Sequence, residues 1–186
     1  MASQALLFAR NFVKHPKMLG SFIPSSPFLI KHLLSQIDFD SARVVLEYGP
    51  GVGTISKELL PRLHPQARLV LIEMNEEFVE FLGSEITDPR VTVVHGSAAE
   101  VRRILKSLGI GGADYIISGI PYSTMPSPLR RTILHESKQA LNRNGQFLVY
   151  QFTRTVLPYL QPVFRSIRQD FELLNILPAR LFYCTP

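Results

Sequence analysis

Three alternating glycines beside a carboxylate are the residues of this sequence whose types and spacing most clearly predict chemistry. The aliphatic run 44–46 leads into Glu47, and Gly49, Gly51 and Gly53 follow. Glycines at such a bend let the backbone approach a ligand closely, because no Cβ blocks the approach and a positive φ costs little. The segment therefore predicts a strand, a tight turn and a helix N-terminus that together cradle a nucleotide-type ligand.

The carboxylate indicates the charge of that ligand. In a dinucleotide fingerprint the glycine spacing lets a helix N-terminus receive a pyrophosphate, but here the third glycine comes one residue early and Glu47 closes the strand. A carboxylate repels a pyrophosphate and favours ammonium and sulfonium charge, as in S-adenosylmethionine. A second strand, 69–72, ends in Glu73 about twenty residues after the glycines, where an acid that binds ribose hydroxyls is expected. Alone, the glycines could simply form a turn, and Glu73 could be a solvated strand end. Together, the glycine turn and Glu73 favour a binding site.

These motifs resemble the class I S-adenosylmethionine-dependent methyltransferases, from Val44 onward. Segment 47–53 is similar to the first motif of that family, Glu73 to the second, segment 95–98 to the part that contacts adenine, and segment 118–122 to the acceptor-side loop. The resemblance implies S-adenosylmethionine as cofactor, S-adenosylhomocysteine as product, and the following cofactor-binding residues: Glu47, Gly49, Pro50, Gly51, Gly53, Thr54, Glu73, Met74, Gly96, Ser97, Ala98 and Ser118.

Length and composition predict one globular domain. The chain has 186 residues, 46% of them hydrophobic, which suffices for a sizeable core; within it we expect cofactor-covering helices at 1–37 and the methyltransferase domain at 38–186. The single Cys184 leaves no intrachain disulfide and predicts a buried hydrophobe. Without a visible secretory signal, a long apolar run or a metal-ligand cluster, we expect no metal and a cytoplasmic protein attached peripherally to the cytoplasmic face of a membrane.

The N-terminal segment carries most of the excess positive charge. The net charge is +5, and residues 1–37 contain no acidic residue, so an anionic partner is plausible. Segment 2–14 predicts an amphipathic helix with apolar side chains on one arc and basic ones on the other, which suits an anionic phospholipid surface. The alternative is that this helix packs on the domain's own core. The candidate membrane-binding residues are Phe8, Arg10, Phe12, Lys14 and Lys17.

Alternating strand and helix patterns predict an α/β fold. The expected architecture is a Rossmann-like, seven-stranded, mostly parallel sheet with helices on both faces, preceded by the amphipathic helix, and with the active face at the carboxyl ends of the strands. We expect strands at 44–47, 69–73, 91–94, 114–117 and 146–152, a closing hairpin of 171–176 and 180–184, and helices at 28–37, 54–63, 75–85, 98–108, 128–141 and 157–167.

A narrower resemblance lies before the first strand. Segment 20–26, a glycine followed by apolar residues, a proline and two serines, is similar to a segment of the bacterial phospholipid N-methyltransferases that lies across the bound cofactor. The resemblance implies cofactor-covering roles for Ile23, Ser25 and Ser26. Ser26 before a proline is also a good helix N-cap, which would by itself account for that residue.

The loop after the fourth strand indicates the acceptor. Methyl transfer from a sulfonium is a direct displacement, which needs an oriented, neutral nucleophile. Amino-methylating enzymes that act on adenine typically carry Asn or Asp where Gly119 stands here, and Ile120, Pro121 and Tyr122 follow. A lipid amine has a pKa of about 10 and must lose a proton. Tyr122 could relay it or present its ring to a methylated ammonium, and His15 is a second candidate base. The alternatives are packing against the cofactor for Tyr122 and an ordinary loop position for His15.

The sequence thus predicts N-methylation of a membrane-lipid amine headgroup, phosphatidylethanolamine towards phosphatidylcholine or a related lipid such as an ornithine lipid. One alternative is an RNA adenine N6-dimethyltransferase, but this would carry Asn or Asp at Gly119 and a C-terminal helical RNA-binding domain. Another is a small-molecule amine methyltransferase. A third is a membrane-binding module that only senses the cofactor, against which the intact Glu47 and Glu73 argue.

Overall fold

The computed structural model describes residues 25–186. Several predictions lie outside this range: the amphipathic helix at 2–14, the membrane-binding residues on and after it, the candidate base His15, and Ile23. Within residues 25–186, no helix has the length and apolar character needed to cross a bilayer.

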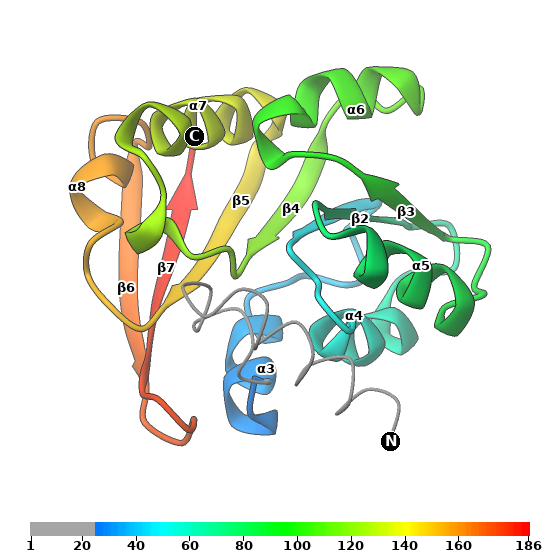
Figure 1. The fold of residues 1–186 in the computed structure, drawn as a ribbon, viewed down its shortest axis with the longest axis horizontal. Helices are drawn as coiled ribbons and strands as arrows, with labels where there is room; N and C mark the ends of the chain where they lie inside the picture. Colours follow the sequence, from blue (N-terminus) through cyan, green and yellow to red (C-terminus); the bar gives the residue numbers. More distant parts are fainter. Residues whose placement is uncertain (1–24) are drawn as a thin grey trace.

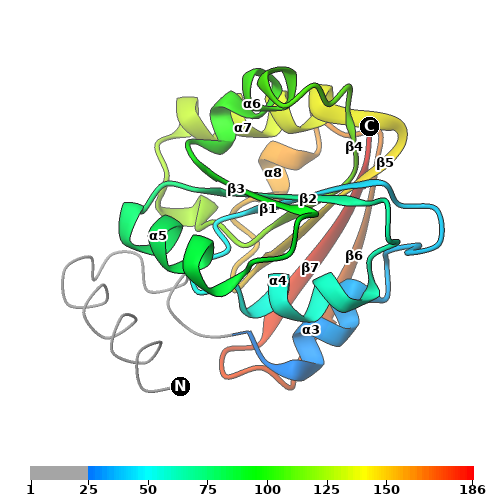
Figure 2. The same cartoon turned by 90° about the vertical axis from the view of Figure 1, so that its right-hand side faces the viewer.

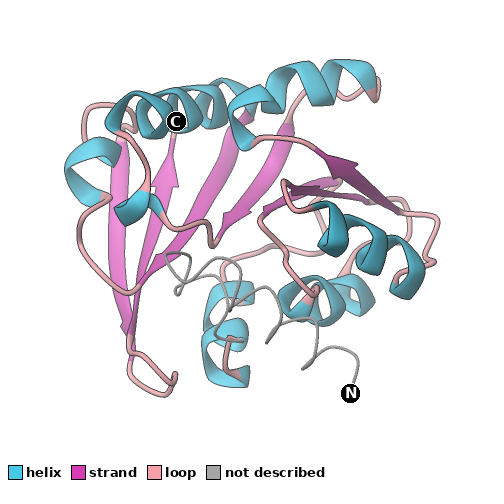
Figure 3. Ribbon diagram, in the orientation of Figure 1, coloured by secondary structure: helices cyan, strands magenta, loops and turns pink. Residues whose placement is uncertain are grey.

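The described residues form one seven-stranded sheet in the order β3-β2-β1-β4-β5-β7-β6 (Figures 1 and 3). The strands are β1 Val44–Tyr48, β2 Arg68–Glu73, β3 Val91–His95, β4 Ala113–Ser118, β5 Leu141–Gln151, β6 Ser166–Glu172 and β7 Ala179–Thr185. The α-helices are α3 Pro27–Leu34, α4 Thr54–Leu59, α5 Glu76–Glu85, α6 Val101–Ser107, α7 Ser127–Ala140 and α8 Leu157–Leu160, and short 3-10 turns occupy Leu60–Arg62, Ala98–Glu100 and Tyr122–Thr124.

Strand direction sets one edge of the sheet apart. Strands β1 to β5 pair in parallel, whereas β7 is antiparallel to both of its neighbours. Because β6 then runs in the same direction as β5, the β6–β7 turn at 173–178 lies at the same edge as the carboxyl ends of the parallel strands. This is the predicted mostly parallel Rossmann-like sheet, with the edge at which such folds bind ligands.

Helices cover both faces of the sheet, as Figure 2 shows: α6, α7 and α8 lie on one side, and α3, α4 and α5 lie on the other. Alternate side chains of β1 supply the two cores, because successive residues of a strand point to opposite faces. Leu46 and Tyr48 pack in the cluster that includes α6 and α7, and Val45 packs in the cluster that includes α3 and α4. All three side chains are buried.

The predicted helix starts are confirmed by their caps. Asn75 caps α5, and its side chain accepts a hydrogen bond from the Phe78 amide. Ser26 caps α3, with Oγ accepting from the Leu29 amide at 3.1 Å and a proline in the first turn. Such side chains satisfy backbone donors that the helix leaves unpaired. The short connections that end at these caps position the loops of the site.

Several boundaries differ from the prediction. The helices expected at 28–37 and 54–63 end earlier, at Leu34 and Leu59. The helix expected at 157–167 ends at Leu160, and β6 begins at Ser166 rather than 171, because Ser166 and Ile167 pair with Thr185 and Cys184 of β7. Strand β5 likewise begins at Leu141 rather than 146; a register shift between Ala113 and Tyr115 of β4 accommodates the residues between. Long-range pairing and an irregularity of this kind leave little local trace in a sequence.

Candidate active site

A cavity opens at the carboxyl edge of the sheet, where the loops after β1, β2, β3 and β4 meet. The structure brings together at its wall many of the residues singled out in the sequence: Gly49, Gly51, Glu73, Met74, Gly96, Ser97, Ala98, Ile120 and Pro121. Side chains that the sequence did not single out complete the wall, namely Tyr48, Ile72, Asn75, Phe78, Thr124, Met125, Leu129 and Ile133.

The glycine turn has the backbone that its composition predicts. Gly49, Gly51 and Gly53 have φ values of 65°, 57° and 75°, in the region that favours glycine. A Cβ on Gly49 would lie 2.7 Å from Cγ2 of Ile120, and one on Gly53 would lie 2.9 Å from Cδ2 of Leu82, whereas one on Gly51 would meet nothing within 4 Å. At positions 49 and 53, both the positive φ and the lack of space for a Cβ require glycine. Gly51 instead faces open space beside the cavity.

Glu73 is held at the cavity wall by three backbone amides. Its Oε1 accepts hydrogen bonds from the amides of Met74 at 2.8 Å and Asn75 at 2.9 Å, and its Oε2 accepts from the amide of Gly51 at 3.1 Å. The side chain is only 8% exposed; burial raises the pKa of this carboxyl and the amide hydrogen bonds oppose that rise. Glu73 is therefore an oriented acceptor for hydroxyl groups, and the alternative of a solvated strand end is excluded.

Glu47 lies behind the glycine turn and does not line the cavity. It is 3% exposed, and its Oε2 accepts a hydrogen bond of 2.6 Å from Oγ of Ser56 in α4. Burial raises the pKa of this carboxyl to about 7, the serine hydroxyl opposes the rise, and the negative charge of Glu73 adds to it. A nearby cation would lower the pKa of such a buried carboxyl and so favour its ionised form.

The remaining predicted residues lie away from the cavity wall. Pro50 and Thr54 continue the turn into α4 and do not line the cavity. Ser118 is buried, with Oγ 3.0 Å from the Tyr122 hydroxyl. Ser26 has the capping role that the sequence left open, because its Oγ accepts from the Leu29 amide at the start of α3. The same Oγ also donates a hydrogen bond of 2.6 Å to the Leu174 carbonyl.

The proposed role of Tyr122 at the acceptor is corrected by the structure. Its side chain is fully buried in the core on the α6–α7 side of the sheet, and its hydroxyl pairs with Ser118 rather than reaching the cavity. Burial raises the pKa of this hydroxyl far above its usual value. Tyr122 therefore packs beneath the acceptor-side loop, while Ile120 and Pro121 face the cavity.

The Tyr150 side chain fills the space that any side chain at position 119 would need. A Cβ added to Gly119 would lie 2.0 Å from the Tyr150 hydroxyl and 2.2 Å from Cζ of its ring. Burial raises the pKa of Tyr150 to about 12, the charge of Glu47 adds to the rise, and a hydrogen bond with the Ser25 side chain opposes it. The sequence analysis did not identify Tyr150, because this residue lies on the neighbouring strand β5. The glycine at position 119 was the one local signal that another group fills this space.

S-adenosylmethionine fits this set of residues. The space over Gly51 leaves room for a ligand to approach the backbone, and Glu73 is an oriented carboxylate that would suit the two ribose hydroxyls of such a cofactor. Gly96, Ser97 and Ala98 line the same cavity, where the resemblance places the adenine.

Comparison with known proteins supports the same chemistry. The sequence pattern of the ribosomal RNA adenine dimethylase family matches residues 13–158. An ornithine lipid N-methyltransferase from Singulisphaera acidiphila is 31% identical over 180 residues, which cover 96% of this chain and 94% of that protein. A ribosomal RNA small subunit methyltransferase A from Mycoplasma capricolum is 29% identical over 125 residues, 65% of this chain but only 45% of the relative.

Solved structures share the fold at low identity. A precorrin-6y C5,15-methyltransferase from Geobacter metallireducens superposes with a TM-score of 0.66 and 15% sequence identity, covering 83% of this chain and 85% of that chain. Identity at this level establishes the shared Rossmann-like architecture and nothing about the acceptor.

We predict that Glu73→Ala weakens binding of S-adenosylhomocysteine at least tenfold. Hydrogen bonds to a charged group contribute about 1.5–3 kcal/mol each, and about 1.4 kcal/mol corresponds to a factor of ten. Isothermal titration calorimetry measures the affinity, and circular dichroism confirms that the variant is folded. The matched control is Glu76→Ala, an exposed carboxylate in the first turn of α5, which should bind normally. Unchanged affinity in folded Glu73→Ala would remove this residue from the site.

We predict that Gly119→Ala lowers the free energy of unfolding by about 1–3 kcal/mol, the usual cost of overpacking. In the background of Tyr150→Leu most of this cost should disappear, because the atoms 2.0 Å from the new Cβ are gone. Urea unfolding of the four proteins of this double-mutant cycle measures the coupling. Gly111→Ala, where a Cβ would meet nothing within 4 Å, is the control. Strict additivity of the two changes would refute the proposed contact.

We predict a pH-dependent stability that arises from Glu47. Its pKa rises from 4.5 to about 7 on folding, so the folded state keeps a proton that the unfolded chain releases between these values. The resulting stability is complete below pH 4.5 and is lost as pH rises through about 7, up to ~3 kcal/mol. Urea unfolding from pH 4.5 to 8 should show this fall in the wild type and in the control Glu58→Gln, but not in Glu47→Gln. Parallel profiles for all three proteins would contradict the assignment.

Proposed function

This chain belongs to the ribosomal RNA adenine dimethylase family and is an S-adenosylmethionine-dependent N-methyltransferase, and from that premise we propose that its acceptor is the amine headgroup of a membrane lipid. More specifically, we propose that the acceptor is phosphatidylethanolamine, which successive methyl transfers convert towards phosphatidylcholine. A related amine lipid, such as an ornithine lipid, would suit the same site. The enzyme would act at the cytoplasmic face of the membrane, on an anionic phospholipid surface.

The observation that carries the proposal is the side chain missing at Gly119. An adenine-specific enzyme uses Asn or Asp at this point to hold the exocyclic amine, but here any side chain would collide with Tyr150, whose hydroxyl lies 2.0 Å from the Cβ position. A flat base therefore loses the group that would hold its amine in line. A flexible primary amine needs no such clamp, because it can rotate to meet a different partner.

Coverage of the relatives supports the same choice. The lipid-methylating relative aligns along 94% of its length, whereas the RNA-methylating relative from Mycoplasma capricolum aligns along only 45%. This chain therefore shares almost its whole length with the lipid-methylating relative and about half of the length of the RNA-methylating one. The match to the ribosomal RNA adenine dimethylase family favours the second candidate function, methylation of RNA adenine, and the chain's net charge of +5 is compatible with it.

The roles of the chain's residues follow from their positions. Bound S-adenosylmethionine supplies a methyl group on a sulfonium. Glu73 and the loop 96–98 hold its nucleoside part, and the charge of Glu47 favours its cationic part. The Tyr150 hydroxyl fills the space beside Gly119 and stays protonated at neutral pH, since its pKa is raised to about 12. Ile120 and Pro121 shape the wall beside it.

We predict that the purified full-length protein transfers label from S-adenosylmethionine to liposomes containing phosphatidylethanolamine and phosphatidylglycerol. Lipid extraction and chromatography should reveal monomethyl, dimethyl or trimethyl headgroups, and an ornithine lipid is tested in parallel. Ribosomal RNA is the competing acceptor, and Glu73→Ala is the inactive control. Label in RNA with none in either lipid would overturn the proposal and favour the second candidate.

A further inference from the structure

Large apolar side chains are exposed at one edge of the molecule. In the part of the chain that the structure describes, eight such side chains are exposed, and every one belongs to a segment at the carboxyl edge of the sheet. We call this set the apolar rim: Phe28, Met74, Leu129, Phe171, Leu173, Leu174, Ile176 and Leu177. Soluble proteins rarely concentrate exposed apolar surface in this way unless something binds it.

The most prominent part of the apolar rim is the β6–β7 turn, at the lower left of Figure 1. Leu173, Leu174, Ile176 and Leu177 are 68%, 60%, 73% and 45% exposed. Exposing four apolar residues within five positions at the tip of a hairpin is unfavourable in water. Full burial of each such side chain would contribute about 1.5–3 kcal/mol of favourable free energy.

The turn is held firmly although its apolar side chains point outward. Asn175, at its centre, is buried; its Oδ1 accepts from the Ser26 amide at 2.8 Å and its Nδ2 donates to the Leu177 carbonyl at 2.8 Å. The Ser26 hydroxyl donates to the Leu174 carbonyl at 2.6 Å. The buried polar residue anchors the turn against α3, next to the exposed Phe28, so the outward leucines and isoleucine are presented by a fixed backbone.

The apolar rim continues to the mouth of the active-site cavity. Met74 and Leu129 line that cavity and are still 68% and 38% exposed. Between β2, which Met74 follows, and β6, which leads into the turn, the sheet has five strand spacings. At about 4.8 Å per spacing, the apolar rim extends over roughly 24 Å. A surface of this length beside the cavity can engage an extended partner while the cavity receives a small group from it.

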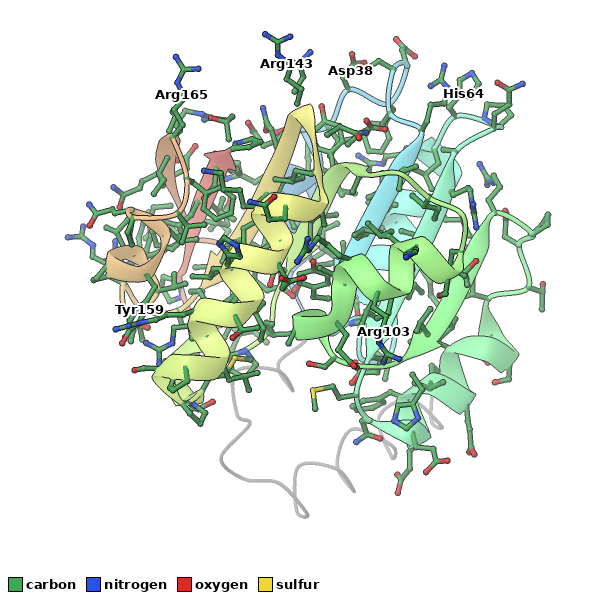
Figure 4. The ribbon with its side chains drawn as sticks, turned by 90° about the horizontal axis from the view of Figure 1, so that it is seen from above. Asp38, His64, Arg103, Arg143, Tyr159 and Arg165 are labelled. Atoms are coloured by element: carbon green, nitrogen blue, oxygen red, sulfur yellow. The ribbon has the colours of Figure 1, made fainter. Side chains whose placement is uncertain are left out.

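The opposite edge of the sheet is charged. Figure 4 shows Asp38, His64, Arg143 and Arg165 projecting along that margin, from the segments that precede β1, β2 and β6 and from the start of β5. At the carboxyl edge, exposed arginines at 131 and 154 accompany the apolar side chains, together with an exposed glutamate at 76 in the first turn of α5. Apolar side chains with flanking basic groups match a bilayer surface that contains anionic lipid.

We infer that the apolar rim docks on a lipid bilayer, with the β6–β7 turn inserted among the headgroups and acyl chains and the cavity mouth facing the lipid surface. The inference rests on the proposed function, because a lipid acceptor leaves its acyl chains in the bilayer while its headgroup enters between Met74 and Leu129. It adds a membrane contact made by the folded domain itself, apart from the amphipathic segment 2–14.

The absence of tryptophan from the sequence allows a direct test. Full-length Ile176→Trp places a single tryptophan at the turn, and Arg143→Trp places one at the opposite edge as the matched control. With liposomes of phosphatidylcholine and phosphatidylglycerol, the emission of Trp at 176 should shift to shorter wavelength and be quenched by brominated acyl chains, while that of the control should not change. Neither lipid is the proposed acceptor and no methyl donor is added, so failure of docking and failure of the proposed function are separate results.

A second pair of variants tests the contribution to binding. Leu173→Ser/Ile176→Ser should weaken liposome binding in a sedimentation assay about tenfold or more, whereas Arg143→Ser/Arg165→Ser should change it little. The inference is overturned by an emission already blue-shifted in buffer and unaffected by liposomes, which would mean that another part of the chain or a second copy covers the turn. It is equally overturned if the serine pair at 173 and 176 binds liposomes as the wild type does.

Discussion

The buried carboxylate of Glu73 is the interaction on which the site depends. It joins the end of β2 to the glycine turn after β1 through the Gly51 amide, and it closes its own loop through the amides of Met74 and Asn75. A carboxylate that is almost fully buried needs such partners, since an unpaired buried charge is strongly destabilising. The same hydrogen bonds that make its burial tolerable also fix its orientation at the cavity wall.

The sheet topology places the chemistry and the apolar surface at the same edge. Parallel strands bring the loops after β1 to β4 together around the cavity, and the reversal of β7 returns the turn between β6 and β7 to that edge. The charged residues of the opposite edge face away from both. Within residues 25–186, the cavity and the apolar rim therefore lie on the same side of the domain.

Local patterns predicted the parts of the site that depend on backbone conformation. The glycine turn, the Asn75 cap and the acid at the end of β2 each leave a signature within a few residues. The early start of β6 was missed because it depends on pairing with β7. The direction of Tyr122 was wrong because an aromatic residue after a proline can turn either to the core or to the cavity, and Tyr150 was missed because it reaches Gly119 from a neighbouring strand. Contacts between strands determine these positions, and the sequence records them only indirectly.

Amide hydrogen exchange with and without S-adenosylhomocysteine tests the central claim most directly, namely that the loops at the carboxyl edge form one cofactor site. We expect slower exchange in the loops at 49–53, 74–75 and 96–98, and unchanged exchange at the opposite edge around residues 143–145. Protection confined to segments outside the cavity wall, despite measurable binding, would contradict the account.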